Sequence, residues 1–361
     1  METLNARQMI AIIVNFMLGS ALIVGVATNV GQDSWIPLLI ALAVMLPFAV
    51  LYGRIIKLFP GKDCFALFEL CFGKIGSRIL DVLVILYALQ IGATMTRTLT
   101  EFTQIVSLPE TPQLPVLLIM LCVATYAAKR GIGTIGKWAV VTLCILALIM
   151  VFTVSLAISH FNYDNFLPLM EHSLPEIGAD TLRLASSPFL ETLLILGLAG
   201  SLRVKSPGKV YLAAYALTGL FLLLILLRNI GLLGVPLLQS VYFSSYSAAR
   251  IVQIGTFLTR IESTISVNFY LVGFTKMAVC IVFAAKGLAH LTGIKDYKNM
   301  VVPIGLLMMA LAAVLFGSTM EMVNFTDNEI LLDFPFEVAV TLLLWIAVEI
   351  KARKKRAVES A

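Results

Sequence analysis

The stretch SSPFLE, residues 186–191, decides how the rest of the chain is interpreted. Proline removes a backbone donor and clashes with the preceding helical turn, and serine side chains offer local hydrogen bonds that compete with a helix. The stretch heads an apolar run, residues 189–202, that is expected to enter a membrane and that carries a carboxyl group at Glu191. Because irregular backbone at membrane depth must line a cavity or be covered by protein, we expect an interrupted helix beside a binding site.

A second interruption is predicted at MLGSA, residues 17–21, in the middle of the first hydrophobic segment. At the helical rise of about 1.5 Å per residue, Gly19 would lie about 18 Å from Arg7, and Pro188 about 21 Å from Leu202. Both breaks would then fall near the bilayer centre. Two broken helices at corresponding positions of two halves are typical of a transporter binding site.

The composition indicates a membrane protein with several spans. The 361 residues are 60% hydrophobic and 13% charged, with a mean hydropathy of +0.97, whereas soluble domains are roughly a quarter charged. The 5 cysteines show no metal-ligand or disulfide spacing, and the sequence contains no phosphate-binding loop, dinucleotide motif or metalloprotease motif. We therefore predict an integral membrane protein with no enzyme activity, metal, cofactor or nucleic-acid partner. The basic tail is interpreted as a contact with the lipid bilayer.

Ten apolar stretches are long enough to be candidate membrane spans. Lys and Arg are concentrated in the loops that would be cytoplasmic if the N-terminus is inside, and acids dominate the other loops. The positive-inside rule therefore predicts that both termini are cytoplasmic. The predicted spans are residues 8–30, 35–57, 77–107, 113–128, 136–159, 185–202, 209–234, 260–286, 300–318 and 334–350.

Five spans per half is an odd number, so two equivalent halves must cross the membrane in opposite directions. The predicted fold is an all-α polytopic membrane protein with ten transmembrane helices in a LeuT-like 5+5 inverted repeat, broken in helices 1 and 6. We expect the first repeat at 1–159, an outer loop at 160–184, the second repeat at 185–350 and a basic cytoplasmic tail at 351–361. The outer loop is expected to hold a short surface helix that covers the site.

Lys276 lies deep within a predicted span, about 15 Å from the level of Lys286. An ionisable residue inside the membrane is a functional hypothesis by default. Our hypothesis is that its ammonium group permanently supplies the positive charge that a sodium ion often supplies beside helix 1 in broken-helix transporters. The alternative is a structural lysine that is bonded to carbonyl groups of helix 1.

Two pairs of opposite charges are predicted to order the structure or to gate the site. Arg97 and Glu101 are four residues apart on one helix face and should pair with each other. Arg260 and Glu262 form the entry to the eighth span, where an ion pair with a neighbouring helix end is expected. Glu191 has three open roles: binding the ammonium group of a ligand, binding a proton, or holding Arg97.

The two breaks predict the chemistry of the ligand. Exposed amides at the Gly19 break suit a carboxylate, since a helix N-terminus binds anions. Carbonyl groups at the Pro188 break, together with Glu191, suit an ammonium group. A zwitterionic amino acid offers both groups. Tyr87 and Ile91, on the third span, either wall this pocket or simply pack.

Several short motifs follow one another along the whole chain. They are NFMLG at 15–19, LPETP at 108–112, YAA and RG within 126–131, FLPL at 166–169, Phe189 with Glu191, RIE at 260–262, and Lys276. In this order they resemble the B subunits of nutrient germinant receptors of endospore formers, the GerAB-type spore germination permeases of the amino acid–polyamine–cation transporter superfamily. One departure is that Gly133 and Lys137 stand where that family often has an acid and an arginine.

The resemblance implies a germinant-sensing subunit in the spore inner membrane that works with an A-type subunit and a C-type lipoprotein subunit. It also implies a pocket between helices 1, 3, 6 and 8, in which germinant binding closes or rocks the two halves and passes the change to the partners. With the two breaks, the predicted ligand-binding residues are Gly19, Ser20, Ala21, Tyr87, Ile91, Ser187, Pro188, Phe189, Glu191, Thr275 and Lys276.

Two other functions remain open at this point. A proton-coupled amino-acid permease needs the same pocket, and it differs from a receptor by net flux through the purified protein. A structural scaffold subunit of a membrane complex differs because substitutions at Gly19 or Lys276 would leave germination unchanged.

Overall fold

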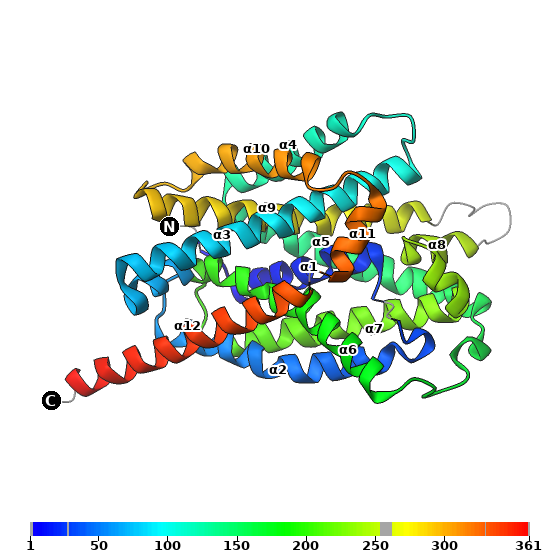
Figure 1. The fold of residues 1–361 in the computed structure, drawn as a ribbon, viewed down its shortest axis with the longest axis horizontal. Coiled ribbons are helices and arrows are strands. Elements are labelled where there is room, and N and C mark those ends of the chain that lie inside the picture. Colours follow the sequence, from blue (N-terminus) through cyan, green and yellow to red (C-terminus); the bar gives the residue numbers. More distant parts are fainter. Residues whose placement is uncertain (1–2, 27–28, 253–261, 329, 360–361) are drawn as a thin grey trace.

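The computed structural model describes residues 3–26, 29–252, 262–328 and 330–359, and these are almost entirely helical (Figure 1). Helices satisfy every backbone donor and acceptor within one segment, which hydrocarbon surroundings require. The α-helices are α1 (Ala6–Val24), α2 (Trp35–Leu58), α3 (Cys64–Val106), α4 (Gln113–Arg130), α5 (Ile132–Ala157), α6 (Leu174–Leu184), α7 (Pro207–Ser240), α8 (Ser244–Ile251), α9 (Glu262–Thr292), α10 (Lys298–Val314), α11 (Thr319–Asn328) and α12 (Ile330–Glu359). Two short helical segments, η4 (Ala185–Phe189) and η5 (Leu190–Ser201), follow α6 directly.

Eight helical stretches within the described residues are long and apolar enough to cross a membrane. Outward-facing positions on these stretches keep large apolar side chains exposed, among them Ile119, Leu148 and Val151. A surface of this kind suits contact with lipid rather than with water. The stretches are 31–58, 64–106, 113–130, 132–160, 174–201, 207–240, 262–292 and 330–357, and two shorter apolar helices cover 6–19 and 298–314.

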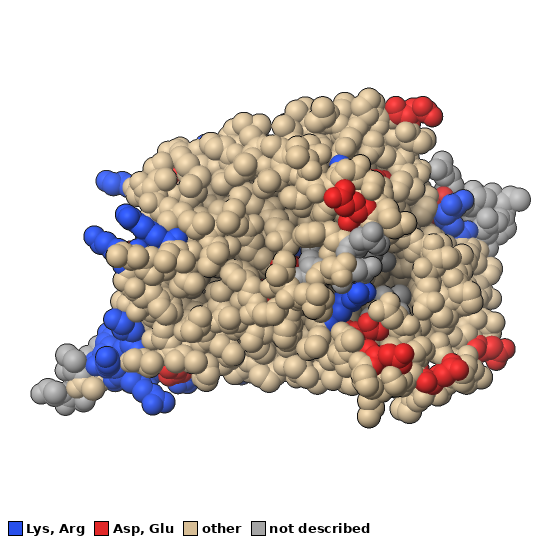
Figure 2. All heavy atoms as spheres, viewed as in Figure 1, with Lys and Arg blue, Asp and Glu red and all other residues tan. Residues whose placement is uncertain are grey.

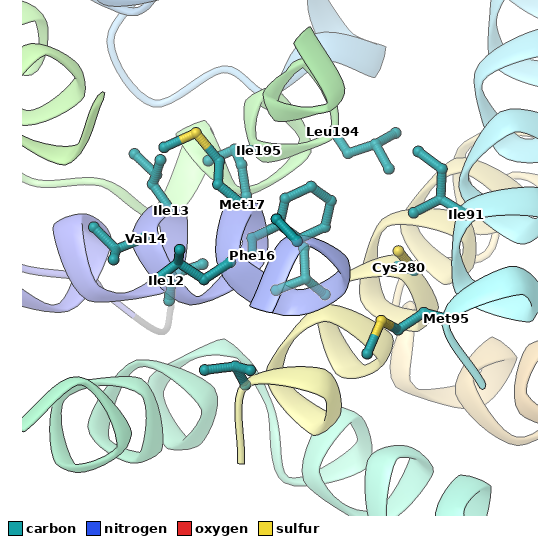
Figure 3. Close-up of a cluster of buried hydrophobic side chains, with 14 of the residues drawn as sticks. Ile12, Ile13, Val14, Phe16, Met17, Ile91, Met95, Leu194, Ile195 and Cys280 are labelled. Atoms are coloured by element: carbon teal, nitrogen blue, oxygen red, sulfur yellow. The ribbon is translucent and has the colours of Figure 1, made fainter. Parts of the chain in front are cut away.

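Helix α1 lies at the centre of the bundle, and every side chain from Ile12 to Leu18 is fully buried. Helices α3, α5, α7 and α9 pack against it. Figure 3 shows the apolar cluster in which Phe16 of α1 lies near Leu194 of η5 and Cys280 of α9. The central helix is therefore held by apolar packing along most of its length.

Charged side chains divide between the two ends of the molecule. On the face shown in Figure 2, most of the visible Lys and Arg side chains lie at the end where Figure 1 marks the C-terminus, and most of the visible Asp and Glu side chains lie at the opposite end. At the basic end, main-chain hydrogen bonds tie the start of the chain to the end of η5, because Leu4 donates to Ser201 at 2.8 Å and accepts from Arg203 at 3.0 Å. The helices thus run between a basic and an acidic face.

The predicted interruption of helix 1 at residues 17–21 is wrong. Helix α1 runs without a break from Ala6 to Val24 and is followed by Gly25. The reason for the glycine is packing, because a Cβ atom on Gly19 would lie 2.7 Å from Cδ of Lys276. Gly19 therefore lets α9 approach α1 closely, as small residues do between membrane helices.

The predicted interruption of helix 6 is confirmed. Helix α6 is followed by one turn of π-helix, η4. Within η4, Ser187 has the non-helical angles φ −109° and ψ 117°. The chain then continues as the 3₁₀-helix η5, which ends at Ser201. The helical segment begins at Leu174 rather than at the predicted residue 185, because a capping box formed by Ser173 and Glu176 starts it there.

Candidate functional site

The first half of the site is an ion pair at the interruption of helix 6. Nζ of Lys276, on α9, lies 2.5 Å from Oε2 of Glu191, on η5, and both side chains are less than a tenth exposed. Oγ of Ser187 donates to Oε1 of the same carboxylate at 2.7 Å. Both oxygens of Glu191 therefore have a donor, and its charge is neutralised by one lysine.

The second half of the site is a carboxylate that sequence reasoning did not single out, Glu337 on α12. Oγ of Ser186 donates to its Oε2 at 2.8 Å, and the hydroxyl of Tyr87 on α3 donates to its Oε1. Glu337 is 0% exposed. Within the described residues its hydrogen-bond partners are hydroxyl groups, and no basic side chain forms a salt bridge with it.

Neighbouring serines therefore connect the interruption to two different carboxylates. Ser186 reaches toward α12, and Ser187 bonds to the following turn of its own segment. One turn before Glu337 on α12, Asp333 accepts a hydrogen bond from Nε2 of Gln90 at 3.3 Å. Three carboxyl groups thus lie at this level of the structure, with the ammonium of Lys276 bonded to one of them.

Lys276 reaches the site through the space that Gly19 leaves open. Its Cδ and Cβ atoms pass within 2.7 and 3.0 Å of the position that a Cβ atom on Gly19 would take. Its ammonium lies 5.3 Å from the ring centroid of Phe16, a distance at which a cation and an aromatic face attract each other. The glycine and the lysine thus form one packing unit.

The predicted pair of Arg97 and Glu101 is confirmed, with Nη2 of Arg97 2.7 Å from Oε1 of Glu101. Oγ1 of Thr319 donates to the other oxygen of Glu101 at 2.6 Å. The hydrogen bond from Thr319 to Glu101 therefore links α3 to the start of α11. Glu191 instead pairs with Lys276, so the structure does not bring Glu191 and Arg97 together.

The other predicted ligand residues occupy varied positions. Ile91 lies in the apolar cluster of Figure 3. The hydroxyl of Thr275 donates to the carbonyl of Leu271 in its own helix, and the carbonyl of Phe189 accepts from the hydroxyl of Tyr215 at 2.9 Å. Ala21 and Pro188 are buried, and Glu262 begins α9. Arg260 and the side chain of Ser20 lie outside the described residues.

The continuous α1 changes one expectation about the ligand. Amides inside an unbroken helix are bonded to carbonyls one turn earlier, so Gly19 presents no exposed amide for a carboxylate. The interruption of helix 6, by contrast, faces Tyr87, Glu191, Lys276 and Glu337. The polar chemistry of the site is therefore concentrated on one interrupted helix.

One signal in the sequence could have indicated Glu337. It lies within the tenth predicted span, residues 334–350, where an acidic side chain is as unusual as the lysine of the eighth span. It stands near the start of that span, where the neighbouring Asp333 makes both acids look like part of an outer loop. Only the fold shows that Glu337 is buried against the interruption.

Comparison with known proteins connects this architecture to germination. Residues 3–318 match the model of a family described as spore germination protein. The chain is 24% identical over 358 residues to spore germination protein KB of Bacillus subtilis, with 98% of this chain and 96% of that protein covered. It is 26% identical over 311 residues to spore germination protein A2 of the same organism, with 83% of each chain covered.

Solved structures with a similar fold are transporters. The chain superimposes on MHP1, a nucleobase-cation-symport-1 family transporter in a closed conformation with bromovinylhydantoin bound, with a TM-score of 0.66, 13% identity, and 90% of this chain and 74% of that chain covered. It superimposes on MhsT in complex with L-phenylalanine with a TM-score of 0.65, 12% identity, and 96% and 95% covered. These matches and the apolar helices establish an integral, multi-pass membrane protein with a LeuT-like transporter fold.

Proposed function

This chain belongs to the spore germination protein family, and on that premise we propose that it is the membrane subunit of a spore nutrient-germinant receptor. The subunit binds a small germinant, an amino acid or a related amine, at the interruption of helix 6 and triggers germination. The family and the similar structures are described as germination proteins and transporters rather than as enzymes. An A-type and a C-type receptor subunit are the proposed partners.

The proposed architecture is a 5+5 inverted repeat of ten spans with both termini in the cytoplasm. Support comes from eight long apolar stretches and two shorter apolar helices among the described residues, and from the separation of basic and acidic ends. The basic end is assigned to the cytoplasm by the positive-inside rule. Residues 1–159 and 185–350 form the two proposed repeats, with 160–184 as the outer loop and 351–361 as the tail.

The observation that supports germinant binding best is the environment of Glu337. A buried carboxylate is costly unless a cation or a proton compensates its charge. Glu191 already has Lys276, whereas the partners of Glu337 are the hydroxyl groups of Tyr87 and Ser186. The amine of a small ligand would supply the missing positive charge next to Tyr87.

The same contacts provide a way to transmit binding. Ser186 lies in the π-helical turn η4 and donates a hydrogen bond to Glu337. A ligand amine that pairs with Glu337 competes with Ser186 for this carboxyl group. A change there moves the outer segment α6, in which Asp180 accepts hydrogen bonds from the backbone N–H of Val30 at 3.1 Å and from the side chain of Asn29 at 3.3 Å. Ligand binding at the interruption would therefore reach Asn29 and Val30, which lie between α1 and α2.

In this proposal Lys276 permanently supplies the positive charge that a bound sodium ion would otherwise supply beside α1. Its contact with Gly19 on α1 and its ion pair with Glu191 on η5 support that role, since one side chain joins the two central segments. The coupling of the site would then depend on the ligand and on protons rather than on sodium.

The test uses spores that carry Glu337→Gln, exposed to a panel of the twenty common amino acids. Glutamine keeps the size and a hydrogen-bonding side chain but removes the charge. We expect a germination response that needs at least about tenfold more amino acid, with normal subunit levels by immunoblotting. Glu110→Gln, which changes an exposed acid, is the matched control. An unchanged dose response in the Glu337 variant, at normal levels, would contradict ligand sensing at this site.

A proton-coupled amino-acid permease is the second candidate, and the same carboxyl group favours it, because Glu337 can compensate its buried charge with a proton as well as with an amine. Uptake of radiolabelled amino acid into proteoliposomes separates the two. A receptor binds without net uptake, whereas a permease accumulates substrate when a proton gradient is imposed. A scaffold subunit would show neither binding nor a germination defect in pocket variants.

A further inference from the structure

The inner ends of α2 and α12 enclose a basic cavity, well away from the interruption of helix 6. Its volume is about 240 Å³, about eight times the roughly 30 Å³ that one water molecule occupies in the liquid. It lies where α2 ends, at Leu58, and where the last turns of α12 carry the basic tail. The lining residues are Arg54, Lys57, Leu58, Phe59, Ala352, Lys355 and Arg356.

The charge of this cavity is strongly positive. Four of its lining side chains are cationic, and Glu349 compensates one of them through a bond of 2.6 Å to Nε of Arg54. The dipole of α2 places roughly half a negative charge at its C-terminal end, which is small beside the two positive charges of Lys57 and Arg356. The bond to Glu349 uses Nε, so the guanidinium of Arg54 still has its terminal N–H donors for a second anion.

An apolar stripe leads along the outside of the bundle to the same cavity. Leu46, Val50 and Arg54 are spaced four residues apart on α2 and therefore share one helix face. Leu46 is 37% exposed and Val50 is 49% exposed. On α12, Ile346 and Ile350 are exposed as well. Acyl chains can therefore lie against both helices while a headgroup occupies the basic cavity.

A second basic cavity at the same end of the molecule lacks this apolar approach. It has a volume of about 510 Å³ and contains Arg203, Lys205 and Lys209. Its apolar lining side chains, which include Ile10 and Val210, are buried or half-buried. Clusters of cationic side chains therefore occur at this end both with and without an adjacent lipid-facing stripe, and the second cavity provides an internal control.

We propose that the cavity between α2 and α12 binds the phosphate headgroup of an anionic phospholipid, with its acyl chains along the exposed stripe of α2. Basic pockets between membrane helices near the cytoplasmic surface bind such headgroups. The lipid, rather than free phosphate, is the proposed ligand because the apolar stripe ends at Arg54. By bridging Arg54 and Lys57 on α2 with Lys355 and Arg356 on α12, the lipid holds the last helix against the second.

The test is native mass spectrometry of the purified full chain in mild detergent, with phosphatidylglycerol and phosphatidylcholine added at equal concentrations. We expect the wild-type protein to retain phosphatidylglycerol preferentially. The double variant Lys57→Ala/Arg356→Ala should bind it about 30-fold more weakly, since each cation near an anionic headgroup contributes on the order of a fivefold gain in affinity. Lys205→Ala/Lys209→Ala removes the same charge from the second cavity and should retain the preference.

Two further measurements separate the lipid from other anions and from loss of structure. The charge-conserving variant Lys57→Arg/Arg356→Lys should keep the preference, which shows that charge rather than side-chain shape is needed. Inorganic phosphate at millimolar concentration should fail to displace the lipid. The proposal is overturned if Lys57→Ala/Arg356→Ala keeps the preference, if the control variant loses it equally, or if phosphate displaces the lipid.

Discussion

Glu191 and Glu337 are both buried carboxylates at the interruption of helix 6, but they are compensated differently. Glu191 receives the ammonium of Lys276 and the hydroxyl of Ser187. Glu337 receives the hydroxyls of Ser186 and Tyr87. The first carboxylate forms an ion pair, whereas the partners of the second among the described residues are hydroxyl groups. In the proposed function, one group holds the site together and the other binds the ligand.

The largest effect is expected for Lys276→Ala, which leaves Glu191 buried without its cation. Removal of one partner from a buried ion pair typically costs about 3–5 kcal/mol of unfolding free energy. Thermal unfolding in detergent should show a clear loss of stability. The double variant Lys276→Met/Glu191→Gln should recover most of it, because neither charge then remains unpaired. Equal stability of the single variant and the wild type would show that the pair has no structural role.

A smaller difference is expected between the two serines. Ser186→Ala and Ser187→Ala each remove a hydrogen bond to a charged acceptor, typically worth about 1.5–3 kcal/mol. The loss at Ser186 should be the larger, because Glu337 has no cation among the described residues while Glu191 keeps Lys276. Chemical unfolding in detergent compares the two. A larger loss at Ser187 would reverse the assignment of the two carboxylates.

The smallest of these effects on stability is expected at Gly19, which leaves space for the side chain of Lys276. Gly19→Ala places a Cβ atom 2.7 Å from Cδ of Lys276, and forcing an atom into a packed core typically costs about 1–3 kcal/mol. Gly178→Ala is the matched control on α6, because its Cβ atom would meet nothing within 4 Å. The control should be neutral or stabilising by up to about 1 kcal/mol through helix propensity. Equal thermal stabilities would contradict close packing at Gly19.

The predictability of the fold differs between the two expected breaks. Pro188 cannot donate a backbone hydrogen bond, so a departure from helix beside it was predictable from residue chemistry alone, and Ser187 has non-helical angles. Gly19 is compatible both with a break and with close helix packing. Only the position of Lys276 on another helix decides between them. A local sequence pattern is therefore sufficient to predict a helix break that local chemistry causes, as at Pro188. It is ambiguous where a residue distant in sequence determines the structure, as at Gly19.

The same distinction applies to the site. Arg97 and Glu101 are one helical turn apart, so their pairing could be predicted from spacing. Glu191 and Lys276 are separated by 85 positions, and Tyr87 and Glu337 by 250. Sequence reasoning identified Glu191 and Lys276 as unusual residues at membrane depth and Tyr87 as a residue that either walls the pocket or packs, but it could not assign them to one another. Contacts over such separations depend on the tertiary packing of α3, α9 and α12.

Binding by the purified protein tests the central claim most directly, namely that Glu337 recognises the amine of the germinant. The amino acid that triggers germination best is compared with the hydroxy acid that replaces its amine by a hydroxyl group, using isothermal titration of the wild type and of Glu337→Gln. We predict that the wild type prefers the amine by at least about tenfold, since charge-assisted hydrogen bonds are roughly twice as strong as neutral ones, and that the variant loses this preference. A variant that keeps the full preference would contradict the account.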